Sequence, residues 1–181
     1  MVNEQYLNEG RAQKELAHGA ESKIGAAGNA ATEYPDLLVD DNLLADDPEW
    51  PTSGLLDSSI FIAGESGRPI NRAGLPTHSV TSVITAGELE TGIHLAPDAE
   101  TRADRLSTYQ AALRLELLPV DRQVSHHWAT LRAAVAQAGR RVNVNDLWIA
   151  AIALANQLPV VTQDNDFDAL AELGGPKVIH V

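Results

Sequence analysis

Three carboxylates at alternate positions, Asp164, Asp166 and Asp168, follow a run of β-branched residues in the segment VVTQDNDFDAL at residues 160–170. Carboxylates this close repel one another unless a cation lies between them. Their spacing copies positions 1, 3 and 5 of a calcium-binding EF-hand loop. However, Ala169 stands where the sharp turn needs glycine, and Gly175 stands where a bidentate glutamate is needed. The remaining alternatives are a solvated turn and one wall of a metal site.

Further acids lie at the end of a predicted strand and at the start of a predicted helix, where catalytic and ligand-binding residues are often found. Asp57 ends the predicted strand in GLLD, and Asp146 opens the predicted helix NDLWIAAIALA with a small apolar face beside it. Each has a structural alternative, as a helix cap or as an acid that complements the helix dipole. Glu88 and Glu90 lie on one predicted helix, and its apolar periodicity does not decide which of them is special.

The elements that position these acids alternate between strand and helix from Gly54 onwards. We expect strands in GLLD, at 77–80, and in LELLPV, PVVT and KVIHV. The first two helices are expected after Ser58 or Ser59 as cap and at 82–93. The next two are expected with Pro97 in a first turn and over DRQVSHHWATLRAAVAQAG, which Gly139 closes. The last two are expected after a cap at Asn145 and at 166–173. This alternation predicts an α/β fold with a mostly parallel central sheet flanked by helices.

Parallel strands explain how distant acids meet. Ligands bind beyond the carboxyl ends of such strands, where Asp57 and Asp164 are both expected. A cluster of carboxylates is self-repelling unless hard cations bind it, and oxygen-only ligation favours Mg²⁺ or Mn²⁺. Such a site positions a phosphate and lowers the pKa of a bound water.

Composition narrows the class of protein. The 181 residues include no cysteine, so disulfides and thiolate-metal sites are absent, and a cytoplasmic location is expected. No apolar run approaches the roughly 20 residues of a membrane span, and the first residues carry no secretory signal. The net charge of −12 argues against nonspecific binding to nucleic acid.

The acidity is concentrated at residues 1–53, which hold 11 acids and 3 bases, whereas residues 54–181 hold 14 acids and 10 bases. The first segment is small, polar and broken by glycine and proline. We expect an acidic extension at 1–53 and a folded domain at 54–181. Composition leaves three interpretations of this extension: a linker, a docking tail or a misplaced start.

Four segments in order, LLDSSIFI, SVITAGELETGI, VNDLWIAAIAL and VVTQDNDFDAL, resemble the PIN-domain family, and most closely its VapC-type toxin ribonucleases. The resemblance covers Gly54 to Val181. It implies Mg²⁺-dependent hydrolysis of RNA phosphodiester bonds by a toxin of a toxin–antitoxin pair. The metal ligands and catalytic acids that it implies are Asp57, Glu88, Asp146 and Asp164, with Asp166 as neighbour or substitute.

The same resemblance implies supporting residues and partners. Ser58 and Thr162 match hydroxyls beside the acids, and Asn145 is expected to orient Asp146. The implied protein partners are a cognate antitoxin and a second copy of the chain in a homodimer. An antitoxin partner also gives residues 1–53 a fourth interpretation, as an antitoxin remnant. Candidate contacts to the RNA backbone are the loop arginines Arg68, Arg72, Arg140 and Arg141.

Three other functions fit the residues less well. A phosphoacceptor receiver domain needs paired acids after the first strand, but Ser58 and Ser59 follow Asp57. A haloacid-type phosphatase needs an Asp-x-Asp there, which is missing. A catalytically inactive PIN scaffold that binds RNA or protein is disfavoured because all four acids are present.

Overall fold

The computed structural model describes residues 51–181, and these form a parallel five-stranded sheet with strand order β3-β2-β1-β4-β5. The strands are β1 (Ser53–Leu56), β2 (His78–Ser82), β3 (Leu117–Leu118), β4 (Val160–Thr162) and β5 (Val178–His180). The helices are α2 (Ser58–Ser66), α3 (Val83–His94), α4 (Ala99–Ala112), α5 (Arg122–Gln137), α6 (Val144–Ala155) and α7 (Asp166–Ala171), with a 3₁₀ turn at Arg72–Gly74. The predicted α/β class is confirmed.

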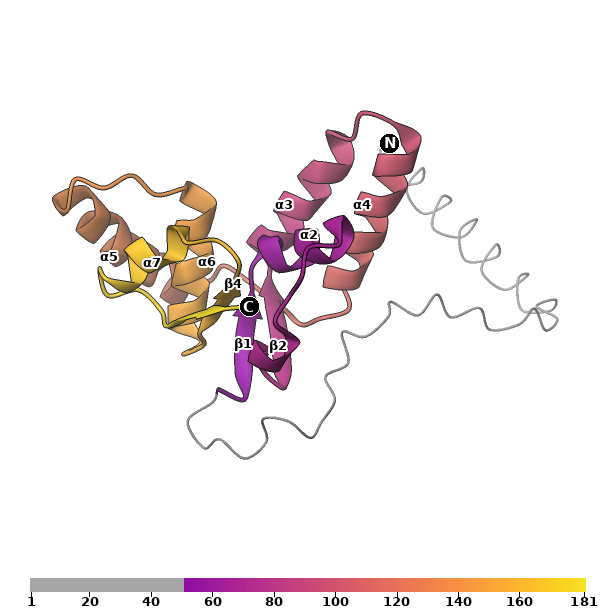
Figure 1. The fold of residues 1–181 in the computed structure, drawn as a ribbon. Coiled ribbons are helices and arrows are strands. Elements are labelled where there is room, and N and C mark those ends of the chain that lie inside the picture. Colours follow the sequence, from indigo (N-terminus) through magenta and orange to yellow (C-terminus); the bar gives the residue numbers. More distant parts are fainter. Residues whose placement is uncertain (1–50) are drawn as a thin grey trace, which may run out of the picture. The chain divides into compact units, whose positions relative to one another are not determined.

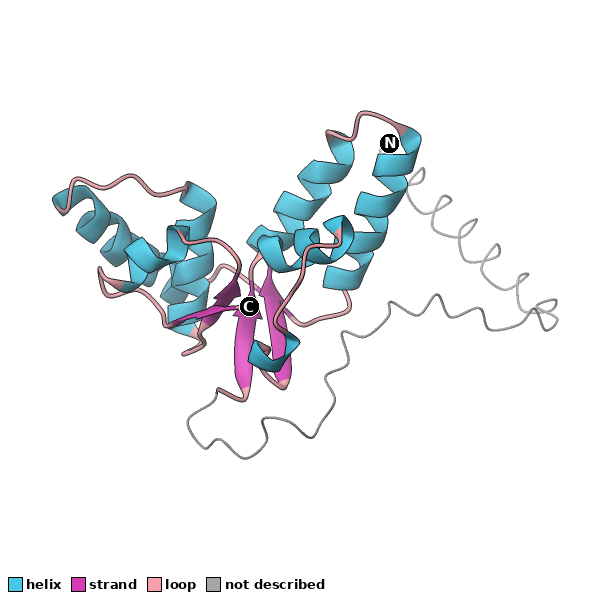
Figure 2. Ribbon diagram, in the orientation of Figure 1, coloured by secondary structure: helices cyan, strands magenta, loops and turns pink. Residues whose placement is uncertain are grey.

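Helices cover both faces of the sheet, with α2, α3 and α4 on one side and α5, α6 and α7 on the other (Figures 1 and 2). Successive side chains of each strand point to opposite faces of the sheet, and this alternation creates two cores. Leu55 and Val160 pack with α5, α6 and α7, whereas Leu56 and Val161 pack with α2 and α3. Because all strands are parallel, the ends of β1, β2 and β4 lie at one edge of the sheet, where the chain passes into α2, α3 and the loop before α7.

Three predicted helix starts are wrong by one to two residues. Ser58 and Ser59 do not cap α2; Asp57 does, by accepting a hydrogen bond from Ser59 N, which confirms the alternative role of Asp57 as a helix cap. Asp98 caps α4, so Pro97 precedes that helix. Asn143 caps α6 in place of Asn145. In α2 and α6 a side chain slightly earlier in the chain reaches the free N–H groups of the first turn, whereas α4 starts later than predicted because Asp98, after the proline, is the side chain that caps it.

The predicted domain start at Gly54 falls inside β1, because Ser53 already pairs with His78 and Thr52 O accepts a hydrogen bond from His78 N at 2.7 Å. The rest of the predicted acidic extension, residues 1–50, lies outside the described residues. Within the described part of the chain, no helix is long and apolar enough to cross a membrane.

Two tryptophans join α5 to α6. The indole rings of Trp128 and Trp148 are stacked, with centroids 4.8 Å apart and planes inclined by 18°. Both side chains pack against the core on the α5–α6 side of the sheet. The Trp128 Nε1 atom is buried and has no hydrogen-bond partner, so this contact is held by ring packing alone.

Candidate active site

Asp57 is held rigidly at the end of β1. Its side chain is only 2% exposed and performs two tasks. Oδ2 accepts the backbone N–H of Ser59 at 3.2 Å and thereby caps α2, and it also accepts a hydrogen bond from Thr162 Oγ1 at 3.1 Å. Ser58 Oγ donates to Oδ1 at 3.4 Å. Capping and site formation are therefore combined in one carboxylate.

Thr162 is the centre of the buried polar network behind Asp57. Its Oγ1 donates to Asp57, accepts the backbone N–H of Asp164 at 2.9 Å, and lies 3.1 Å from Ser59 Oγ. Because an ionised carboxylate only accepts, the single Thr162 proton belongs to Asp57, and Ser59 is then the donor to Thr162. Ser59 Oγ in turn accepts the N–H of Gln163 at 3.0 Å. One hydroxyl thus fixes two of the acids relative to each other.

Thr162→Val is expected to lower the free energy of unfolding by about 1–3 kcal/mol, because it leaves buried polar partners unpaired while keeping the side-chain shape. Urea denaturation in EDTA measures this loss. Thr130→Val is the matched control: its hydroxyl donates to His126 O on an exposed helix face, so the change should stay within about 0.5 kcal/mol. Equal effects of the two substitutions would mean that the network contributes nothing.

Glu88 reaches the same edge from α3. Its side chain is half-buried, whereas Glu90 is exposed and accepts a hydrogen bond from Tyr109 at 3.4 Å. Asn145 Nδ2, from the first turn of α6, donates to Glu88 Oε1 at 2.9 Å. The resemblance implied that Asn145 orients Asp146, but its hydrogen bond is to Glu88. The other carboxylate oxygen, Oε2, is buried without a hydrogen-bond partner.

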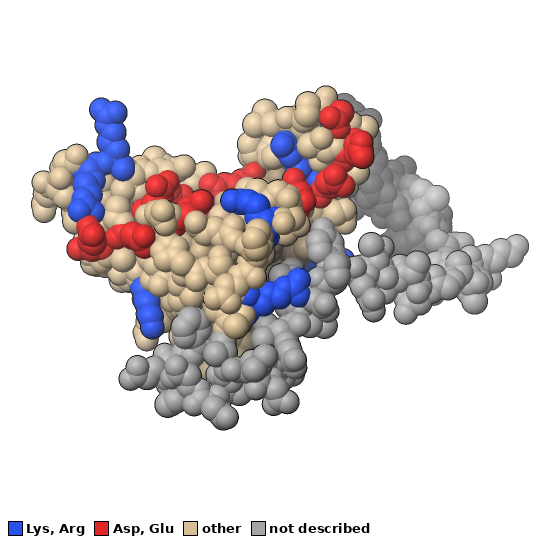
Figure 3. All heavy atoms as spheres, viewed as in Figure 1, with Lys and Arg blue, Asp and Glu red and all other residues tan. Residues whose placement is uncertain are grey.

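The pKa of Asp146 reflects its burial and the acids near it. Burial raises its pKa to about 7, and the negative charges of Asp57, Glu88, Asp166 and Asp164 add to the rise. The other four acids that the resemblance implied as metal ligands therefore all lie within electrostatic range of Asp146. Figure 3 shows acidic side chains gathered where the surface dips between the two groups of helices.

Asp164 is more exposed and lies under opposing influences. Burial raises its pKa, as do the charges of Asp57 and Asp166, whereas Arg68 lowers it. The positive charge of the Arg68 guanidinium thus partly offsets the negative charges around Asp164. Asp168 takes no part in it: this side chain is exposed and pairs with His180 Nε2 at 2.9 Å, so the third aspartate of the opening segment belongs to the α7–β5 surface.

The donor set fits a hard divalent cation. It consists of carboxylate oxygens, the ligands that Mg²⁺ and Mn²⁺ prefer, and the buried Glu88 Oε2 lacks the partner that a buried oxygen normally has. Among residues 51–181, no three histidine, aspartate or glutamate side chains are placed so that they could hold a metal ion in the arrangement of this structure. The fit rests on the chemistry of the donors and on that unpaired oxygen.

The family model of the PIN domain matches residues 54–173, well over half of the chain. This chain belongs to the PIN-domain family. Ribonuclease VapC5 of Mycobacterium tuberculosis is 46% identical over 131 residues, which make up 72% of this chain and 97% of the relative. Ribonuclease VapC4 of the same organism is 44% identical over 121 residues, 66% of this chain and 92% of the relative. The resemblance inferred from the four sequence segments is confirmed.

A solved structure agrees with these relatives. The crystal structure of a member of the VapBC family of toxin–antitoxin systems, VapBC-5 from Mycobacterium tuberculosis, matches this PIN domain with a TM-score of 0.67 and 43% identity. The match covers 72% of this chain and 100% of that chain. The sequence match and the structural match each cover 72% of this chain.

The four arginines predicted to contact RNA differ in their surroundings. Arg68 is held by a hydrogen bond from its Nε to Ser66 Oγ at 3.2 Å, and its charge acts on Asp164. Arg140 instead forms an ion pair with Glu172 at 2.6 Å and donates to Ala169 O. Arg72 and Arg141 are exposed. Of the four, Arg68 has the clearest electrostatic link to the acids of the PIN domain.

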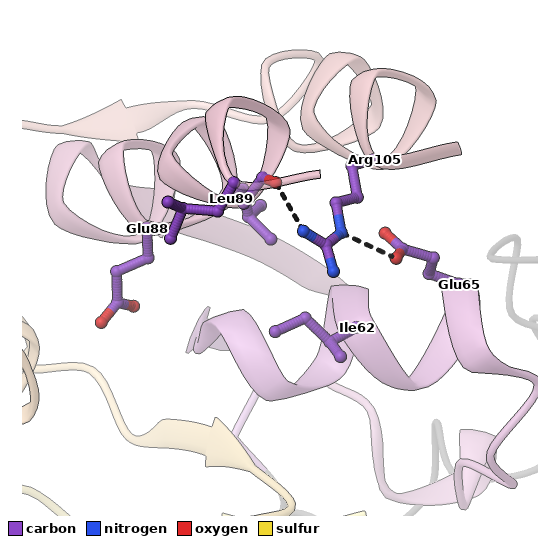
Figure 4. Close-up of a pocket in the computed structure, with 7 residues that line it drawn as sticks. Ile62, Glu65, Glu88, Leu89 and Arg105 are labelled. Atoms are coloured by element: carbon purple, nitrogen blue, oxygen red, sulfur yellow. Dashed lines mark hydrogen bonds and ion pairs between the residues drawn. The ribbon is translucent and has the colours of Figure 1, made fainter. Parts of the chain in front are cut away.

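A cavity of about 220 Å³ lies beside Glu88 and is lined from α2, α3 and α4. Arg105 bridges it by donating to Gly92 O at 2.6 Å, with its Nε 4.0 Å from Glu65 (Figure 4). The Glu88 carboxylate points away from this arginine. Arg105 therefore belongs to the wall of the cavity, where its partners are Gly92 O and Glu65 rather than Glu88.

Two residues of the network were missed in the sequence. Ser59 joins Thr162 to the backbone of Gln163, and the Gln163 side chain donates to Pro69 O at 2.8 Å and to Val181 O at 3.1 Å. These contacts tie the loop after β4 to the loop after α2 and to the last residue. A small hydroxyl and an amide in a loop carry no periodic signal, so only the tertiary structure of the PIN domain reveals them.

Proposed function

We propose that this protein is a Mg²⁺- or Mn²⁺-dependent endoribonuclease and the toxin of a toxin–antitoxin pair. The observation that carries the proposal is the set of four acids that act on Asp146: burial, and then the negative charges of these acids, raise the pKa of that residue to about 7. The names of the VapC ribonucleases that are 44–46% identical support the substrate class. Asp57, Glu88, Asp146 and Asp164 are the proposed catalytic acids and ligands, with Asp166 beside them.

A bound divalent cation at these acids would lower the pKa of a water molecule and stabilise charge on the phosphate. The chain's own residues prepare this site. Thr162 and Ser58 hold Asp57 in one rotamer, and Thr162 also fixes the backbone of Asp164. The raised pKa of Asp146 favours its neutral form. A cation placed among the acids would offset their negative charge and so favour the ionised form that can bind it.

The RNA backbone is anionic and would be repelled by the acids alone, so positive charge is needed nearby. Arg68 is the proposed phosphate contact, because its charge already acts on Asp164. Arg72, Arg140 and Arg141 are proposed as weaker contacts; Arg140 would first have to leave Glu172. The RNA would thus bind along the loops at the carboxyl edge of the sheet.

We also propose a cognate antitoxin and a homodimer as partners, and the cytoplasm as location. The antitoxin is supported by the solved VapBC-5 toxin–antitoxin structure, and the location by the absence of cysteine from the sequence. By family resemblance, the antitoxin tail covers the acidic site.

The test is cleavage of a labelled RNA by the full-length protein with Mg²⁺, with Mn²⁺, and with EDTA. Cleavage in the presence of either metal but not in EDTA is expected, and Asp57→Asn should lose it because the first acid is then neutral. Cleavage that persists in EDTA would contradict a metal-dependent mechanism. Metal-independent RNA binding without cleavage would instead favour the inactive scaffold.

The domain division is proposed with a revised boundary. A chain shortened to residues 51–181 retains all of β1 and the Thr52–His78 hydrogen bond, so we expect it to unfold cooperatively and to keep its response to metal. A start at Gly54 removes Ser53 from the sheet and should unfold at a lower temperature. Thermal melts of both chains check this, and loss of cooperative unfolding in residues 51–181 would show that the preceding segment contributes to the core.

A further inference from the structure

We infer that Asn145 is a positioning residue for Glu88: it holds one carboxylate oxygen, so that the other faces the site of the cation. This inference rests on the proposed function, because it takes Glu88 to be a metal ligand. It differs from the role that family resemblance gave to Asn145, which was to orient its sequence neighbour Asp146.

The two oxygens of Glu88 have opposite surroundings. Oε1 accepts a hydrogen bond of 2.9 Å from Asn145 Nδ2, whereas Oε2 is buried and has no partner. An ionised carboxylate only accepts hydrogen bonds, so the NH₂ end of the asparagine amide must face Oε1. A buried oxygen without a donor is costly, and a cation is the partner that this oxygen lacks.

The Asn145 side chain is well placed to impose an orientation. It lies in the first turn of α6, where Asn143 Oδ1 accepts the Asn145 backbone N–H at 2.9 Å and caps the helix. The next residue is Asp146, which interacts electrostatically with Glu88. One helical turn therefore supplies an acid and also the donor that aligns a second acid, 57 residues away in the sequence.

Removing this donor should weaken metal binding. Without Asn145, the Glu88 carboxylate can rotate about its terminal bond, and this freedom must be lost again when a cation binds. Loss of a partner that orients a metal ligand typically lowers metal affinity by about 10- to 100-fold. For Asn145→Ala we expect the dissociation constant for Mn²⁺ to rise at least about tenfold.

The experiment is calorimetric titration of the full-length protein with Mn²⁺ in the absence of RNA. Asn143→Ala is the matched control, because it removes the cap of the same helix without touching Glu88. It should lower the melting temperature in EDTA but leave the Mn²⁺ dissociation constant within about threefold of wild type. Asn145→Leu, which has a similar shape and no donor, provides a second variant and should weaken Mn²⁺ binding as Asn145→Ala does.

A double-mutant cycle with Glu88→Gln separates positioning from a general structural effect. If Asn145 acts through Glu88, adding Asn145→Ala to Glu88→Gln should change the Mn²⁺ dissociation constant by less than about twofold. A tenfold loss in both backgrounds, or wild-type affinity in both Asn145 variants, would overturn the inference. A wild-type protein that does not bind Mn²⁺ at all would overturn the proposed function itself, and is thereby distinguished from failure of the positioning role alone.

Discussion

Glu88→Gln is expected to lower metal-dependent RNA cleavage by about a thousandfold, whereas Glu90→Gln should keep it within about threefold of wild type. The first substitution replaces a charged oxygen at the acidic edge with a neutral amide and removes stabilisation of charge in the transition state. The second changes an exposed side chain whose hydrogen bond is to Tyr109. Cleavage of a labelled RNA under single-turnover conditions with Mg²⁺ measures both rates.

The pair makes a sensitive control because the two glutamates lie two residues apart on the same helix. Each substitution keeps size and removes one negative charge, so their effects on helix stability should be similar. Loss of activity in Glu90→Gln with retention in Glu88→Gln would reverse the assignment of the α3 acid. Equal, small effects in both would remove α3 from the catalytic site.

Asp146→Asn should abolish cleavage to a similar extent, yet in EDTA at pH 8 it should melt several degrees above the wild type. Burial, and then the negative charges of the surrounding acids, disfavour ionisation of Asp146 and raise its pKa to about 7, and a neutral amide of the same shape avoids both costs. Because the group is only half-buried, water screens part of the effect, and about 1–2 kcal/mol is expected. Active sites commonly lose stability in this way for the sake of function.

The pH dependence gives this prediction its sign. The folded-state pKa lies above the unfolded value near 4, so between about pH 4 and pH 7 the folded protein binds more protons than the unfolded chain. The contribution of Asp146 to stability therefore falls as pH rises through this range. The advantage of Asp146→Asn should be largest near pH 8 and nearly absent near pH 4.

Added Mg²⁺ completes the comparison. It should raise the melting temperature of the wild type, because metal binds only the assembled site, and move that of Asp146→Asn much less. Melts of both proteins with Mg²⁺ and with EDTA, at pH 4.5 and pH 8, provide the data. A mutant that is less stable at pH 8 in EDTA and responds equally to Mg²⁺ would make Asp146 an ordinary helix-start residue.

Sequence patterns predicted the parallel sheet and the edge at which Asp57 and Asp164 lie, because strand–helix alternation determines where the carboxyl ends meet. They failed at helix starts. The segment DSS offers three adjacent capping side chains, and NVN offers two asparagines; the one that caps is decided by backbone direction, which short-range propensity does not contain.

Aspartates at helix starts illustrate the limit for the site. Asp98 and Asp146 both lie at the beginning of a helix, but hydrogen bonds from Thr101 lower the pKa of exposed Asp98, whereas burial among other acids raises that of Asp146. The helix wheel likewise left Glu88 and Glu90 unresolved, and burial distinguishes them. The Asn145–Glu88 contact joins two helices, so no local pattern could predict it.

The stacked indoles of Trp128 and Trp148 give the protein an internal optical signal. Two parallel chromophores with centroids 4.8 Å apart couple their electronic transitions, so near-ultraviolet circular dichroism should carry a band that exists only while α5 and α6 are packed. Trp148 lies two residues after Asp146 on α6. Spectral changes during a metal titration would therefore report movement of the helix that carries this acid, whereas a spectrum unchanged at saturation would show that side chains alone adjust.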